Sequence, residues 1–237
     1  MDCSHRIQSL GKHPRILHTF HVFWDKQSYT LYVIQEPTGC EEFFVETLLA
    51  HFTFEEPVIV AILKQVLEVL VFWHSSGMVW NDCRASHFYL KLDGSLAINT
   101  MSLRSILQLK TRDSLPFMAP ELIQNTEIPI EQRAKADIWS FAMTAIQMAN
   151  GESPYKGIKD NNEISDMIIR GKRPPLINAQ NFSPQFKNML DRCLNLDLTK
   201  RPTAQELCNL ELFQNAPGKE VIRDKFFPTD RQQPTST

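Results

Sequence analysis

The segment that most constrains the fold is ADIWSFAMTAIQMANG (136–151), a helix-forming run that is apolar on nearly every face. A helix without a polar face must be surrounded by other elements, so we expect it at the centre of a domain. Gly151 is expected to end this helix as its C-cap. A chain of 237 residues is long enough to build a sizeable buried core around it.

A second long helix and several strands are predicted around this centre. In residues 57–74, apolar side chains recur at three- and four-residue steps, which indicates one buried helical face: Ile59, Leu63, Val66, Leu70 and Trp73. The remaining predicted elements are strands over 15–24 and 28–36, a short helix over 41–52, a hairpin over 88–98 that turns at Asp93-Gly94, and helices starting at Ser183 and at the capping box TAQE (203–206). This order indicates an α+β protein, with a small β-rich portion before a larger helical one.

Composition excludes several function classes. The net charge of −2 predicts no nucleic-acid partner and no attraction to an anionic membrane. The longest apolar run (57–73) is interrupted by Lys64, Gln65 and Glu68, so we expect it to be too short and too polar for a membrane span. The five cysteines form no CxxC pair, which is typical of reduced thiols. We therefore expect a cytoplasmic protein, with the nucleus as an additional location.

The stretch MVWNDCRASHFYL (78–90) has the spacing of a catalytic loop, because it combines an acid at Asp82, a cation at Arg84 and an imidazole at His87. Four further motifs stand at fixed distances from it: HPRI (13–16), MAPEL (118–122), DIWSFA (137–142) and CLNLDLTKRPTAQEL (193–207). Together, over about residues 5–214, they resemble a eukaryotic protein kinase. The resemblance implies a partial small lobe over 1–36 and a mainly helical large lobe over 37–214. We expect a disordered tail over 215–237.

The catalytic positions of a kinase can be compared with this sequence one by one. Trp80 takes the histidine place of His-Arg-Asp-Leu-Lys-x-x-Asn, Asn81 the arginine, Asp82 the aspartate, Arg84 the lysine and His87 the asparagine. The Asp-Phe-Gly motif falls on Thr100, Met101 and Ser102. Asp82 is thus retained, while His87 and Thr100 replace both magnesium ligands. This pattern predicts neither a bound metal nor a required cofactor.

Other positions keep structural roles in the resemblance. Trp80 and Met101 are bulky and apolar, as the column that joins the two kinase lobes requires. Asp137 opens the central helix, and Glu121 is expected to form an ion pair with Arg201. Gln35 stands at the hinge gatekeeper place, and the Glu36 carbonyl and Thr38 amide are expected to meet an adenine ring, which predicts weak ATP binding.

The upstream part of a kinase small lobe is not found in this sequence. No GxGxxG motif occurs, and the positions of the first three strands, the phosphate-binding lysine and its glutamate partner have no counterpart. Two strands alone are marginally stable and leave bare edges. We interpret the chain as a shortened product, an isoform or a gene model, or as a chain whose edge is covered by a partner.

Within the kinase-like families, the sequence is most similar to the sterile-twenty-related adaptor (STRAD) pseudokinases. Their degraded loop reads Lys-Ala-Ser-His, and this chain has Arg84-Ala85-Ser86-His87. Their central helix ends in Ala-Asn-Gly followed by x-x-Pro-aromatic, as at 149–155 here. The resemblance implies a non-enzyme that binds and allosterically activates liver kinase B, together with an armadillo-like scaffold, upstream of AMP-activated kinase signalling. This chain departs from that family in retaining Asp82 and in lacking the Trp-Glu-Phe end that docks the scaffold.

Three functions therefore remain open. The preferred one is the pseudokinase adaptor, for which 103–117 and 155–170 are the expected partner-binding surfaces by analogy with kinases. The second is a weak or atypical serine/threonine kinase that uses Asp82 and Arg84. The third is a truncated, non-functional relative, which would unfold without cooperativity.

Overall fold

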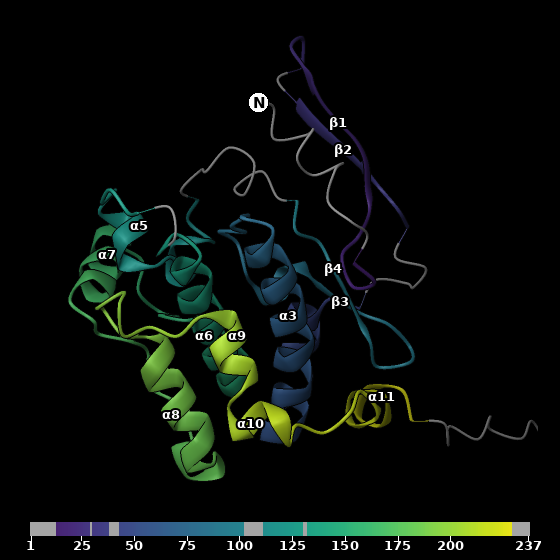
Figure 1. Cartoon of the computed structure of the whole chain (residues 1–237), viewed down its shortest axis with the longest axis vertical. Helices are drawn as coiled ribbons and strands as arrows, with labels where there is room; N and C mark the ends of the chain where they lie inside the picture. The colour runs from purple at the N-terminus through teal and green to yellow at the C-terminus, as the bar shows by residue number, and fades with distance from the viewer. Residues whose placement is uncertain (1–12, 29, 38–42, 102–110, 130–131, 229–237) are drawn as a thin grey trace, which may run out of the picture.

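The computed structural model describes residues 13–28, 30–37, 43–101, 111–129 and 132–228 (Figure 1). Its strands are β1 (Thr19–Asp25), β2 (Thr30–Gln35), β3 (Phe88–Leu90) and β4 (Leu96–Ile98). Its helices are α2 (Val45–Leu49), α3 (Glu56–Ser75), α5 (Pro120–Ile123), α6 (Lys135–Asn150), α7 (Asn161–Ile169), α8 (Pro184–Cys193), α9 (Ala204–Cys208), α10 (Glu211–Gln214) and α11 (Glu220–Phe226), with 3-10 turns η1 (Ala85–His87), η2 (Leu115–Phe117) and η4 (Ala179–Asn181). The β1–β2 ribbon stands at one end and the helices gather at the other (Figure 1), so the α+β prediction is confirmed.

Helix α6 is the centre of the helical part, as its sequence predicts. Every side chain from Ala136 to Met148 is buried. The helix ends at Gly151, which adopts a left-handed φ of 70° and donates its amide to the Gln147 carbonyl. Two buried polar side chains of α6 form hydrogen bonds to neighbouring loops. The Ser140 hydroxyl donates to the Phe117 carbonyl at 2.8 Å, and the Thr144 hydroxyl donates to the Cys83 carbonyl at 2.9 Å. The central helix thus holds the loops around it by hydrogen bonds as well as by packing.

Helix α3 lies against α6, α9 and α11 and is the second core helix (Figure 1). By length and composition alone this 20-residue helix could cross a membrane, which the sequence-based prediction had excluded. However, 67% of its apolar window is buried inside the fold. A buried core helix passes the same criterion, because both environments select apolar side chains.

Two small antiparallel pairs make up the β structure. β1 pairs with β2, with Phe23 opposite Tyr32, and β3 pairs with β4 around the predicted turn at Asp93-Gly94. Gly94 needs to be glycine, because its φ is 81° and a Cβ would lie 2.1 Å from the Lys219 carbonyl oxygen. The turn is therefore shaped to receive the segment that leads into α11.

The C-terminal part confirms two predictions and corrects one. Ser183 caps α8, and Thr203 with Glu206 forms the capping box of α9. The predicted disordered tail over 215–237 is wrong in part, because α11 packs on the fold with Ile222 fully buried. The α11 segment is rich in charged residues, as a disordered tail would be. However, the apolar side chains of Val221, Ile222 and Phe226 pack against the core and dock the helix on the fold. Residues 229–237 lie outside the described residues.

Candidate active site

Helix α6 fixes the shape of the loop at 80–84 through Asp137, which is fully buried. One oxygen of its carboxylate accepts hydrogen bonds from the Trp80 amide at 2.8 Å and lies 2.9 Å from His74 Nε2. The other oxygen accepts from the Asn81 amide at 2.6 Å. Asn81 has a left-handed φ of 62°, a conformation that needs support from its surroundings. The buried carboxylate provides that support and sets the direction in which the following residue points.

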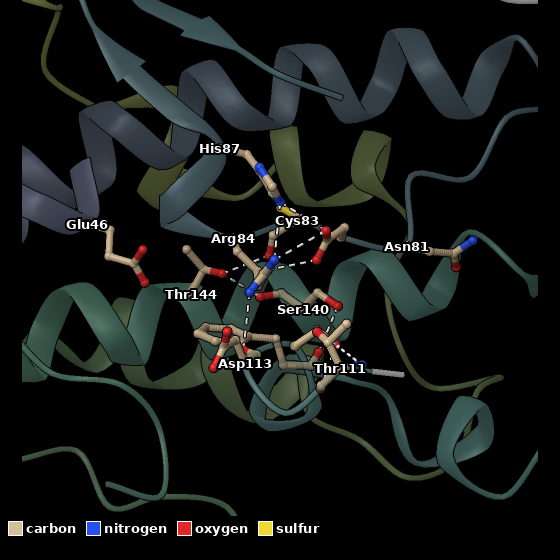
Figure 2. Close-up of polar contacts among 12 residues, drawn as sticks. Glu46, Asn81, Cys83, Arg84, His87, Thr111, Asp113, Ser140 and Thr144 are labelled. Carbon is tan, nitrogen blue, oxygen red and sulfur yellow. Dashed lines mark hydrogen bonds and ion pairs between the residues drawn. The ribbon is translucent and has the colours of Figure 1, made fainter. Parts of the chain in front are cut away.

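The residue that follows, Asp82, is fully buried and has both carboxylate oxygens engaged, by the side chains of Arg84 and His87 that Figure 2 labels. Arg84 Nε lies 2.7 Å from Oδ1, and His87 Nε2 lies 2.9 Å from Oδ2. Arg84 also donates from Nη1 to the Asp113 carbonyl at 3.1 Å, and its guanidinium lies 6.0 Å from the centre of the Phe117 ring. Arg84 therefore links the catalytic loop to the segment at 111–117, and the Asp82 carboxylate has a fixed orientation.

The two substituted metal positions do not fit magnesium. His87 directs its Nε2 at Asp82, and the neutral side chain of Thr100 is buried at 2% exposure. In the part of the chain that the structure describes, no three histidine, cysteine, aspartate or glutamate side chains come together as a metal site. Magnesium prefers several oxygen ligands in an octahedral arrangement. At these positions the described residues offer magnesium only the carboxylate of Asp82, which already faces the guanidinium of Arg84 and the imidazole of His87.

The predicted apolar residues of the interior are both buried. Trp80 is 1% exposed and has its ring 6.2 Å from that of Phe88 and 6.3 Å from that of His87. Met101 is 7% exposed, and its amide donates to the Asn99 side chain at 2.9 Å. Trp80, the first residue of the 80–84 loop, thus packs its ring beside Phe88 at the start of β3.

The hinge residues show a contact that the sequence did not predict. Gln35 donates from Nε2 to the side chains of Thr19 and Asn99, at 3.1 Å each. The Glu36 amide donates to the His18 carbonyl, and Thr38 lies outside the described residues. Asn99 thus joins the end of β2 to the Met101 backbone. No sequence signal marked Asn99, because a single asparagine after a strand is commonplace.

Glu121 and Arg201 meet as the sequence predicts, in a bidentate pair with distances of 2.7 and 3.2 Å. Both are buried, and Arg201 also donates to the backbone carbonyls of Lys135 and Asn195. Its guanidinium lies 5.2 Å from the Trp139 ring. Because every donor direction is used, the pair ties α5 to the start of α6 and to the segment before α9.

A cavity of about 600 Å³ forms a groove that is lined in part by Arg84, the residue whose guanidinium contacts Asp82. Its walls come from α2, η1, the 111–117 segment, the 153–158 loop and α7; they include Glu46, Ser86, Asp113, Phe117, Tyr155 and Ile158. Tyr155 has a left-handed φ of 58°, burial raises the pKa of its phenol, and its hydroxyl donates to the Lys172 carbonyl. Part of the predicted partner surface at 155–170 thus lines this groove; residues 103–110 of the other predicted surface lie outside the described residues.

Comparison with known proteins identifies the family. The family profile described as the protein kinase domain matches residues 4–213. Serine/threonine-protein kinase ppk11 of Schizosaccharomyces pombe is 32% identical over 72% of this chain and 56% of its own length. Serine/threonine-protein kinase 10 of Xenopus tropicalis is 32% identical over 72% of this chain and 18% of its own length. Serine/threonine-protein kinase cst-1 of Caenorhabditis briggsae is 32% identical over 71% and 34%. The chain thus spans little more than half of one of these relatives and less of the others.

These relatives contradict the prediction that the chain is not an enzyme. All three carry the name of serine/threonine-protein kinases, and nothing in the comparison sets the chain apart from them as a pseudokinase. That prediction was wrong because it rested on the substitutions at His87 and Thr100, whereas the similar proteins are named serine/threonine-protein kinases. The expectation of a kinase-like fold is confirmed by the family match. The chain belongs to the protein kinase domain family, with homologues in the STE20-like group of serine/threonine kinases.

Proposed function

We propose that this chain is the catalytic portion of a serine/threonine protein kinase that uses Asp82 to orient a substrate hydroxyl. The observation that carries the proposal is the environment of Asp82: a buried carboxylate with a fixed orientation, held by His87 and by Arg84, which also lines the neighbouring groove. A catalytic base needs a fixed orientation and a path for the substrate. Arg84 and His87 supply the fixed orientation, and the groove lined by Arg84 is the path that the proposal assigns to the substrate.

The proposed reaction transfers the terminal phosphoryl group of ATP to a serine or threonine hydroxyl. The hydroxyl oxygen forms a bond to phosphorus, the bond to the ADP oxygen breaks, and the hydroxyl proton passes to the Asp82 carboxylate. The proposal assigns no step to a metal, because the described residues do not fit magnesium. Phosphoryl transfer depends largely on positioned charge, much of which a metal ion normally supplies. Without metal ligands at these positions, we therefore expect the transfer to be slow. Weak ATP binding at the Glu36 carbonyl and Thr38 amide is part of the same proposal.

Phosphate transfer to a generic substrate protein tests this function directly. Purified chain with ATP and either Mg²⁺ or Mn²⁺ is expected to transfer phosphate slowly, and Asp82→Asn is expected to abolish the transfer. Asp166→Asn is the matched control, because Asp166 is an exposed carboxylate on α7. The proposal fails if the wild-type chain transfers no phosphate, or if Asp82→Asn transfers as much as the control.

A second candidate is the binding and allosteric activation of another serine/threonine kinase, of the liver kinase B type, with an armadillo-like scaffold and upstream of AMP-activated kinase signalling. It is favoured by the Arg84-Ala85-Ser86-His87 sequence, in which His87 supports Asp82 rather than an open metal position. The mechanism would be conformational: the partner would bind this surface better in its active state than in its inactive one. This candidate is compatible with phosphate transfer by the chain itself.

Activation is measured on the partner kinase. Liver kinase B activity toward a peptide is expected to rise when the chain and the scaffold are added, and to rise equally with Asp82→Asn. No rise, together with no co-purification, rules the candidate out. Both candidates place the protein in the cytoplasm, with proteins rather than nucleic acids or membranes as partners.

A further inference from the structure

Another cavity, of about 420 Å³, lies between α6, the 173–179 segment and α8. It shares no lining residue with the groove beside Arg84. The apolar part of its lining consists of Ile146, Pro174, Pro175, Leu176, Ala179 and Leu190. Ile146 and Leu190 are 1% and 4% exposed and belong to the core in which α6 packs against α8, so this part of the lining is fixed by the interior of the fold.

The outer wall of the cavity, at 173–178, is held in one conformation. Asn150, the last residue of α6, donates from Nδ2 to the Pro175 carbonyl at 3.0 Å and accepts from the Ile177 amide at 2.8 Å. The two successive prolines of the segment each fix a φ angle. Asn178 has a left-handed φ of 53°, a conformation that persists where the surroundings support it. Because the wall is formed in advance, a ligand has less chain to order when it binds.

The lining carries one cation that has no carboxylate of its own. Arg173 Nη2 lies 2.5 Å from Asp191 Oδ1, so the charges of these two lining residues offset each other. Lys187 of α8 also lines the cavity, and within the described residues its ammonium has neither an ion pair nor a hydrogen bond. An apolar cavity with one unpaired cation on its wall fits a ligand that combines an apolar group with a carboxylate.

The surface beside the cavity favours a protein segment as that ligand. Ile177 follows Leu176 in the chain and is 43% exposed, so the apolar surface continues beyond the cavity. A small carboxylic acid would fill the cavity and leave Ile177 uncovered. An extended peptide can place one apolar side chain in the cavity and cover Ile177 with a neighbouring residue.

We propose that this cavity is a docking site for an extended segment of a partner protein, in which an acidic residue stands close to an apolar side chain. Lys187 receives the carboxylate, and the apolar side chain enters the space beside Leu176 and Leu190. The inference goes beyond the proposed function, since it assigns a binding site that contains neither Asp82 nor Arg84. It therefore does not depend on phosphate transfer.

Anisotropy titrations with fluorescein-labelled peptides test this site. Each peptide carries one leucine and one glutamate in a glycine–serine background, in either order and with zero to three residues between them. Glutamine replaces the glutamate as a neutral isostere, lysine replaces it as a cation, and alanine replaces the leucine. At low salt, one spacing is expected to bind about fivefold more tightly than its glutamine counterpart, and about tenfold more tightly than its alanine counterpart.

Two variants of the chain separate the charge from the cavity. Lys187→Gln is expected to bind the glutamate and glutamine peptides equally, whereas Lys159→Gln, at an exposed lysine outside the cavity, is expected to keep the preference. Ala179→Phe fills the cavity from the start of η4 and is expected to weaken the binding of every leucine peptide by about tenfold. Thermal unfolding checks that the variants remain folded. Lys187→Gln decides the question even where Ala179→Phe does not fold, because Lys187 is only half-buried.

The inference is overturned if no peptide binds, if glutamine or lysine peptides bind as tightly as the glutamate peptides, or if the preference survives Lys187→Gln. Sedimentation of the chain without peptide tests a second copy as the occupant. A dimer that Ala179→Phe dissociates, together with no peptide binding, would make the cavity an interface between copies of this chain and would also overturn the inference. Glutamate-selective binding without phosphate transfer would support this site and count only against the proposed kinase activity.

Discussion

The catalytic loop and the β1–β2 ribbon are anchored in opposite ways. The loop at 80–84 is held by the buried carboxylate of Asp137 and carries its own buried ion pairs at Asp82. The ribbon exposes large apolar side chains to solvent. The rings of Phe23 and Tyr32, both exposed, stack with their centroids 4.9 Å apart. The loop therefore takes its shape from the interior of the helical part, and the ribbon contributes little to that shape. The predictions below test this difference, from the largest expected effect to the smallest.

The largest effect is expected from Arg201→Ala, because it leaves the Glu121 carboxylate buried without its partner. The free energy of unfolding should fall by about 3–5 kcal/mol. Urea unfolding followed by tryptophan fluorescence measures this loss. Arg173→Ala is the matched control: its pair with Asp191 is exposed on both sides, so its removal should cost only about 0–1 kcal/mol. Equal losses in the two variants would show that the buried pair stabilises the fold no more than the exposed pair does.

The next largest effect is expected from Asp137→Asn, which removes the charge that receives the Trp80 and Asn81 amides. A loss of about 1.5–3 kcal/mol in the free energy of unfolding is expected from weakening hydrogen bonds to a charged group. Amide hydrogen exchange should speed up at Trp80 and Asn81. In the ribbon, exchange at Phe23 and Tyr32 should stay as it is. Faster exchange in both regions would contradict the separate anchoring of the loop.

A smaller effect is expected at α11, which is fastened to the outside of the helical part. Lys219 Nζ lies 2.5 Å from Asp93 Oδ2, and Lys225 Nζ lies 2.8 Å from Glu55 Oε1. These hydrogen bonds lower the pKa of both carboxyl groups. Their stabilisation is therefore complete above the unfolded pKa values of about 4 and is lost as the pH falls through the lowered folded values.

The measurement compares thermal unfolding at pH 5 and pH 3. The double variant Lys219→Met, Lys225→Met should lose less stability on acidification than the wild-type chain, by about 0.5–1 kcal/mol, because these pairs are exposed to solvent. Lys172→Met, at an exposed lysine outside these pairs, should behave like the wild type. An identical acid response in the double variant would mean that other carboxyl groups set the pH dependence.

Much of the fold follows from periodicity, whereas much of the site does not. The apolar pattern of α3 and α6, the turn at Asp93-Gly94 and the cap at Ser183 are local properties, and each is found where the sequence predicts it. Family motifs placed Glu121 opposite Arg201 across 80 residues. The hydrogen bond between Gln147 and Glu46 joins residues 101 apart and has no motif, so only the tertiary fold brings the two side chains together. The α11 helix was missed because its apolar residues are few and its partners lie far back in the chain.

The smallest effect is expected from the ribbon itself. Trp24→Thr replaces an exposed aromatic side chain with a good strand former, so the free energy of unfolding should change by no more than about 0.5 kcal/mol. Leu67→Ala provides the contrast, because Leu67 is fully buried in α3 and its truncation should cost about 2–5 kcal/mol. Amide exchange at Trp80 and Asn81 should be the same in Trp24→Thr as in the wild type. If Trp24→Thr instead destabilises the chain as much as Leu67→Ala, the exposed face of the ribbon is covered in solution, and the ribbon and the loop belong to one cooperative unit.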